Sequence, residues 1–144
     1  MKKNTLVILI LLFLSSTSHA TQNNINSYFK EAKKLFDEKK YENAKFYFEK
    51  DIVFDPKSES SYLYLAKIFK KEEKDNLEEN NLNTVLLLNP RNEEAIYLLT
   101  LLNIKKSNFS KARELITTFT AVCKKMCSTK KELEDQLSSS LKSK

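Results

Sequence analysis

The chain has 144 residues, a formal net charge of +6 and a charged fraction of 31%. It contains no glycine, no tryptophan, two prolines and one histidine. Without glycine the sequence can form no phosphate-cradling loop, no dinucleotide-binding fingerprint and no nucleophile elbow, so the enzyme classes built on them are excluded. The length suits one domain with a modest core.

Residues 1–20 have the pattern of a secretory signal peptide. Two lysines follow the first methionine, an unbroken apolar run covers 6–14, and a small-x-small cleavage signal ends at Ala20. The apolar run is too short to span a bilayer comfortably. We therefore predict cleavage after Ala20, a mature chain that starts at Thr21, and export to the periplasm or to the outside of the cell. The alternative is an uncleaved signal that anchors the chain.

Cleavage would remove His19, the only histidine. The mature chain would then have no histidine to activate a serine or cysteine and no HExxH zinc site. Its net charge would be +4 and dispersed among carboxylates, unlike the clustered basic stripe of a nucleic-acid-binding protein. We predict that the protein is not an enzyme and takes no cofactor, metal, small-molecule substrate or nucleic acid. Membrane contact is expected only if the signal stays uncleaved.

The two prolines mark an internal repeat. Pro56 and Pro90 lie 34 residues apart, and each follows an apolar segment and an Asp or Asn. Proline ends one helix and starts the next because it lacks the amide hydrogen and restricts the residue before it. The period divides the chain into three repeats, 25–58, 59–92 and 93–126.

Apolar residues recur at spacings of three and four within each repeat, which predicts two helices per repeat with one packing face each. The small inward position of the second helix is Ala44 in the first repeat and Ala112 in the third. Glu78 occupies this position in the second repeat. Because an unpaired buried carboxylate is costly, we expect Glu78 to tilt outward and this repeat to pack more loosely.

Two segments, 41–45 (YENAK) and 109–113 (FSKAR), resemble the aromatic-x-x-Ala opening of the second helix in the tetratricopeptide repeat (TPR) family. The Asp-Pro and Asn-Pro junctions are similar to the repeat boundary of that family. The resemblance covers the three repeats within 21–127. It implies an all-α, right-handed α-solenoid of three helix-turn-helix repeats, as in small exported bacterial TPR proteins.

Residues 128–144 are predicted to form a capping helix and a frayed tail. Thr129 followed by Glu132 has the form of a capping box. Leucines then recur every four residues, at Leu133, Leu137 and Leu141. Such a helix would cover the last apolar face of the repeat array.

Cys123 and Cys127 are the only cysteines and lie between the last repeat and the capping helix. A metal site would need about four ligands, and the mature chain offers no others. Redox catalysis usually uses C-x-x-C in a fold with strands, whereas this pair is C-x-x-x-C. A disulfide and two free thiols both remain open on the residues alone. The resemblance to exported repeat proteins with a Cys pair at this junction favours the disulfide.

In the TPR family the first helices of successive repeats line a concave groove that binds partners. Carried over residue by residue, the resemblance gives a candidate groove of Phe29, Lys33, Phe36, Tyr64, Lys67, Lys71, Tyr97 and Leu101. Aromatic residues at such positions are good interface candidates because they are enriched at binding hot spots. For Leu98, Leu101 and Ile104 the alternative is packing beneath the capping helix.

We therefore predict a non-enzymatic protein–protein interaction module of the cell envelope that binds a peptide or protein partner in this groove. The arrangement of Lys, Asn and Arg with which some family members grip a C-terminal carboxylate is absent, so that specificity is not carried over. The alternative function is a structural subunit of a membrane-associated envelope assembly, anchored by an uncleaved signal or by a membrane partner.

Overall fold

A computed structural model of the protein describes residues 20–142, with side chains from Ser27 onward, and all regular structure in this range is helical. The chain separates into two compact units, Met1–Pro56 and Lys57–Lys144, which we describe one at a time. Over the described residues, no helix has both the length and the hydropathy that a membrane crossing requires. Most of the predicted signal peptide lies outside the described residues, and its cleavage stays a prediction.

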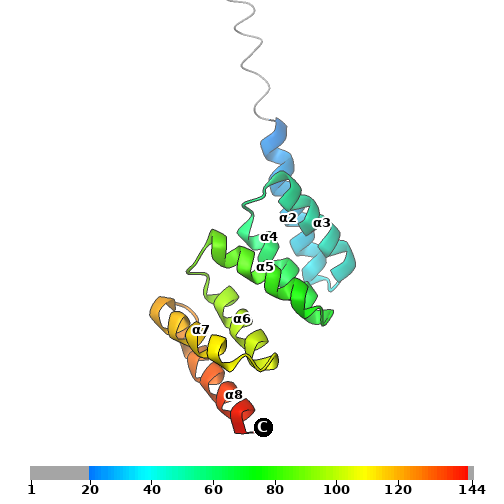
Figure 1. Cartoon of the computed structure of the whole chain (residues 1–144). Helices are drawn as coiled ribbons and strands as arrows, with labels where there is room; N and C mark the ends of the chain where they lie inside the picture. The colour runs from blue at the N-terminus through cyan, green and yellow to red at the C-terminus, as the bar shows by residue number, and fades with distance from the viewer. Residues whose placement is uncertain (1–19, 143–144) are drawn as a thin grey trace, which may run out of the picture. The chain divides into compact units, whose positions relative to one another are not determined.

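The first unit contains a helical hairpin of α2 (Ala20–Asp37) and α3 (Tyr41–Phe54) (Figure 1). Ala32 of α2 and Ala44 of α3 have no exposed surface, and neither does Phe48 of α3. The two alanines leave room for the helices to approach each other, and Phe48 fills the space between them.

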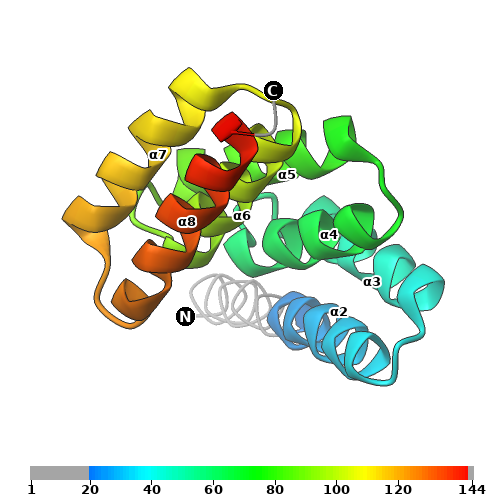
Figure 2. The same ribbon diagram turned by 90° about the horizontal axis from the view of Figure 1, so that it is seen from below.

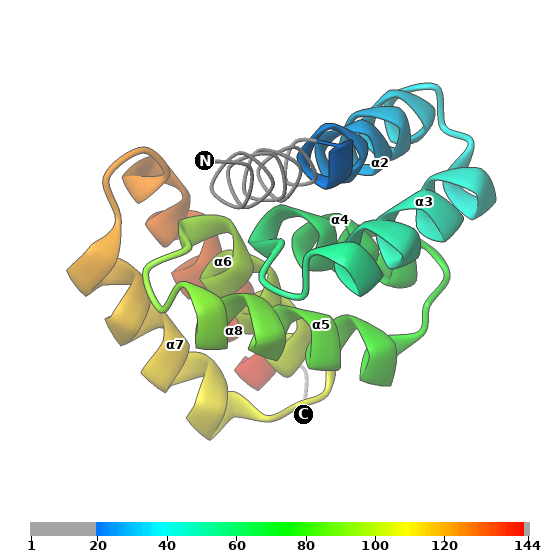
Figure 3. The same ribbon diagram turned by 90° about the horizontal axis from the view of Figure 1, so that it is seen from above.

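The second unit contains the remaining elements, and its four repeat helices begin at the spacing that the 34-residue period predicts. They are α4 (Glu59–Lys71), α5 (Asp75–Leu88), α6 (Glu93–Lys105), α7 (Phe109–Val122), a short 3₁₀ turn η1 (Cys127–Thr129) and α8 (Lys130–Lys142). The starts of α4 and α6 lie 34 residues apart, as do those of α5 and α7. Each helix packs on the next, and α8 contacts both α6 and α7 (Figures 2 and 3). The expected all-α repeat fold is confirmed.

One apolar core runs through the second unit, from α4 to α8, and α6 lies at its centre. Eight residues of α6 are buried, from Ala95 to Ile104, because α5, α7 and α8 each contact this helix. The largest core side chains without exposed surface include Leu82, Ile96, Phe119 and Leu133. Burial of each such side chain stabilises the fold by about 1.5–3 kcal/mol.

Each of the three turns within the helical hairpins contains one non-glycine residue with positive φ. Lys39, Glu73 and Ser107 all have positive φ, near 60°, and they are spaced by 34 residues. Around Ser107, Ser107 N–H donates to the Ile104 carbonyl and Asn108 N–H to the Asn103 carbonyl. These bonds define a Schellman motif, whose left-handed position is usually a glycine. Each first helix therefore ends on a residue in an unfavourable conformation.

Two sequence-based expectations on local structure were wrong. Glu78 does not tilt outward: it is only 3% exposed, and burial raises the pKa of its carboxyl group. Helix α5, which carries Glu78, packs against both α4 and α6, and these helices cover the position. The capping box is also not formed, because the Thr129 hydroxyl donates to the Met126 carbonyl and the Glu132 carboxylate accepts from Tyr97.

The C-terminal helix α8 does cover the core. Leu133 is fully buried and Leu137 is 7% exposed, whereas Leu141 is 40% exposed. Asn103 of α6 is a polar residue within the buried part of this unit. Its amide donates to the Leu99 carbonyl and accepts from the Asn108 side chain, so both of its polar ends have partners although the residue is buried.

Candidate functional site

The predicted groove residues of α4 form a linked cluster with the first turn of α6. The Lys67 ammonium lies 2.7 Å from a carboxylate oxygen of Glu94 and 4.6 Å from the centre of the Tyr64 ring. The Lys67 side chain is 22% exposed and that of Glu94 is 41% exposed. The lysine is therefore held over the tyrosine ring and neutralised by a carboxylate. We call these three residues the Tyr64 cluster.

Tyr97 on α6 is also bonded within the protein. Its hydroxyl donates to a carboxylate oxygen of Glu132 on α8, at 2.8 Å. Burial, and then the hydrogen bond to Glu132, raises the pKa of Tyr97 to about 12, so the hydroxyl stays a donor over the physiological range. Tyr97 thus ties the capping helix to the repeats. Sequence reasoning missed this pair because Glu132 was assigned to a capping box.

The aliphatic groove candidates on α6 belong to the core or lie against it. Leu98 and Ile104 are buried in the same core as Leu133 and Leu137 of α8, and Leu101 is half-buried against that core. The alternative expectation, packing with the capping helix, describes them better than an open groove does. Lys71, the last residue of α4, is exposed.

The remaining three candidates, Phe29, Lys33 and Phe36, lie on successive turns of α2 in the first unit. The ring of Phe29 lies 5.8 Å from the ring of Phe48, and that of Phe36 lies 5.4 Å from that of Tyr41. Both aromatic residues are half-buried in their own hairpin. Lys33 forms an ion pair with Asp37 one turn later.

The junction between α7 and α8 carries the two cysteines. Their Cα atoms are 5.2 Å apart and their sulfur atoms 2.15 Å apart, which is the spacing of a disulfide. Glu93 of α6 fixes this loop, because its carboxylate accepts the backbone N–H groups of Lys125 and Met126, at 3.0 and 2.8 Å. The bond from Met126, with those from the adjacent lysines, lowers the pKa of Glu93. No pattern in the sequence indicates this contact.

The described residues include no group of three or more His, Cys, Asp and Glu side chains that could hold a metal ion. In the Tyr64 cluster the Lys67 ammonium is paired with the Glu94 carboxylate. The arrangement offers polar and aromatic contacts, and no nucleophile stands beside a general base in the Tyr64 cluster.

No family model matches the sequence, and no curated protein matches it either. Solved structures resemble the chain in fold. The first TPR of Spaghetti (RPAP3), bound to an HSP90 peptide, has a TM-score of 0.72 at 17% identity, covering 82% of this chain and 95% of its own. The fold is a TPR solenoid. A C-terminal TPR-containing domain of a Plasmodium falciparum putative FK506-binding protein has a TM-score of 0.71 at 14% identity, with 90% of this chain and 94% of its own covered.

A third similar structure is bacterial. It is the type III secretion chaperone SycD of Yersinia enterocolitica, in complex with a peptide of the translocator YopD. Its TM-score is 0.69 at 16% identity, and the match covers 84% of this chain and 92% of its own. At these identities the similarity establishes the fold.

Proposed function

We propose that this protein is a non-enzymatic interaction module that binds a peptide or protein segment on the surface formed by α4 and α6, around the Tyr64 cluster. The single observation that carries the proposal is the cluster itself: a half-buried tyrosine ring, with a lysine and a glutamate beside it, joins the first helices of two repeats. Two of the similar structures hold a bound peptide, which supports this class of function.

The cluster suits a partner recognised by shape and hydrogen bonding more than by net charge. A partly exposed ion pair such as that of Lys67 and Glu94 is worth about 1 kcal/mol, so a partner can open it at little cost. Once opened, it offers the partner one cationic donor and one carboxylate acceptor beside an aromatic ring. An extended or helical peptide backbone with its polar side chains supplies complementary groups.

The signal-like N-terminus supports a location in the cell envelope or outside the cell. In that setting a small repeat array with no cofactor would serve to hold a partner in place. The alternative is a structural subunit of a membrane-associated envelope assembly, anchored by an uncleaved signal or by a membrane partner.

Site-specific photo-crosslinking in the cell of origin tests the proposal. A photoreactive phenylalanine analogue at position 64 should give a discrete protein adduct. The matched control is the same analogue at Leu87 on α5, which is 82% exposed and lies outside the cluster. With the partner so identified, Tyr64→Ala should weaken binding by about 1–3 kcal/mol, whereas helical content stays unchanged. Adducts of equal yield at both positions, or at Leu87 alone, would contradict the proposal.

A further inference from the structure

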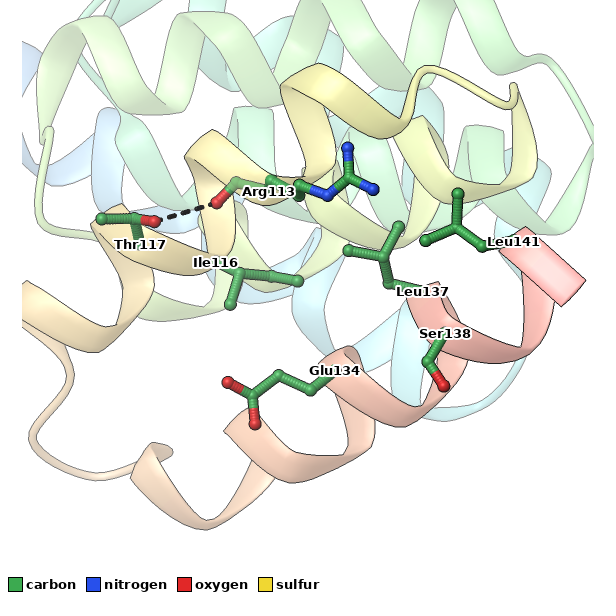
Figure 4. Close-up of a pocket in the computed structure, with 7 residues that line it drawn as sticks. All are labelled: Arg113, Ile116, Thr117, Glu134, Leu137, Ser138 and Leu141. Carbon is green, nitrogen blue, oxygen red and sulfur yellow. Dashed lines mark hydrogen bonds between the residues drawn. The ribbon is translucent and has the colours of Figure 1, made fainter.

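A second concave feature lies outside the Tyr64 cluster, between α7 and α8 (Figure 4). It is a pocket of about 390 Å³, a size within the range of ligand-binding clefts. Its floor is apolar and its ends are polar; the lining residues are Arg113, Ile116, Thr117, Glu134, Leu137, Ser138 and Leu141. Ile116 and Leu137 are buried, but Leu141 leaves 40% of its surface exposed at the pocket, so the apolar floor remains accessible.

The charges at this pocket do not balance. Glu134 forms an ion pair with Lys130, one turn earlier on α8, at 3.5 Å. The Arg113 guanidinium has no hydrogen bond or ion pair to any other described residue, although its carbonyl accepts from Thr117. In Figure 4 the Arg113 and Glu134 side chains lie at different ends, with Ile116 and Leu137 between them. Among the described residues, the pocket thus has one cation without a paired carboxylate beside an apolar floor.

The cation is an arginine in a chain whose basic residues are almost all lysines. The sequence has 25 basic residues, and only Arg91 and Arg113 are arginines. A guanidinium presents a planar fork of N–H donors that matches a carboxylate, and it is less strongly hydrated than an ammonium group. An arginine beside an apolar floor therefore favours a ligand that carries a carboxylate next to an apolar side chain.

We propose that the pocket between α7 and α8 is a second docking site, which receives one apolar side chain of a partner peptide and pairs the neighbouring carboxylate with Arg113. The volume accommodates a side chain such as leucine together with the adjacent backbone. The carboxylate comes from an acidic residue or from the C-terminus of the partner. The site does not share a residue with the Tyr64 cluster, so each can be tested without the other.

N-acetyl-leucine is the simplest probe because it joins an isobutyl side chain to a carboxylate. Titrated into the isotope-labelled protein, it should shift the backbone amide resonances of α7 and α8 in a saturable manner. N-acetyl-leucinamide, which lacks the charge, and acetate, which lacks the side chain, should each bind at least about tenfold more weakly. Decanoate tests a lipid chain as the alternative source of the same chemistry.

Three variants complete the experiment. Arg113→Gln should weaken N-acetyl-leucine binding by about tenfold, and Leu141→Ser should weaken it by several-fold, because both side chains are exposed and their loss leaves the core intact. Arg91→Gln removes the other arginine, on the turn before α6, and should change nothing. Circular dichroism checks that each variant keeps its helical content.

The proposal is overturned if no saturable shift occurs in α7 and α8, or if N-acetyl-leucinamide binds as well as N-acetyl-leucine. Unchanged affinity in Arg113→Gln also overturns it, as does binding of decanoate alone. Shifts confined to α4 and α6 would place the probe at the Tyr64 cluster, which would favour the proposed function while refuting the second site.

Discussion

Glycine at the last turn of a first helix should stabilise this protein, although glycine is absent from its sequence. Ser107 has φ of 60° at the left-handed position of a Schellman motif. The left-handed conformation costs a residue with a Cβ atom roughly 1–2 kcal/mol, and glycine loses about 0.5–1 kcal/mol through its larger freedom in the unfolded chain. The difference predicts that Ser107→Gly raises the free energy of unfolding by about 0.5–1 kcal/mol.

The neighbouring position supplies the control. Lys106 has φ of −76°, a conformation open to any residue, so Lys106→Gly gains no conformational relief. It should lower the free energy of unfolding by about 0.5–1 kcal/mol. Urea unfolding, followed by circular dichroism at the helical band, measures the free energy of unfolding of both variants. Its dependence on urea concentration should be the same in both, because neither change alters the surface exposed on unfolding. If both glycines destabilise the protein equally, the left-handed conformation at Ser107, and the energetic reasoning drawn from it, are wrong.

Four further outcomes follow from the structure and the sequence. Burial raises the pKa of Glu78, so the protonated carboxyl group stabilises the folded state fully below the unfolded-state pKa of 4.5, and this stabilisation is lost as pH rises through the folded-state pKa. In urea unfolding at several pH values, Glu78→Gln should reduce this loss of the free energy of unfolding. Tyr97→Phe should speed hydrogen exchange in α8, as expected for the loss of about 0.5–1.5 kcal/mol. Thiol labelling of protein from an oxidising compartment should find neither Cys123 nor Cys127 reactive. The intact mass of exported protein should match a chain that begins at Thr21, and a heavier species that retains the first residue would favour the anchored form.

The repeat fold could be predicted because its signals are local and periodic. Pro56 and Pro90 fix the period, and Ala44 and Ala112 fix the face on which two helices approach closely. The ends of the helices follow from those landmarks. What the period could not reveal is the conformation at Ser107 and its equivalents, because the usual marker of a left-handed turn is glycine and this chain has none.

The candidate site was predicted less well than the fold, for a different physical reason. A register indicates which side of a helix a residue occupies but not what a later segment places against it. The register assigned Tyr97 to the groove, but it did not show that α8 supplies Glu132 as its partner. The register likewise assigned Lys67 to the groove, but it did not show that Glu94 pairs with its ammonium group. Both partners come from other helices, and one sequence does not show such pairings.

The first turn of α6 makes two of these long-range contacts, each through a different carboxylate. Glu93 and Glu94 are adjacent, so their side chains leave the helix in different directions. Glu93 accepts the backbone of the loop that carries the disulfide, whereas Glu94 holds Lys67 over the ring of Tyr64. One helical turn thus positions the junction to α8 with one carboxylate and the candidate binding surface with the other. Because α6 is buried on several sides, its first turn is a rigid base for both.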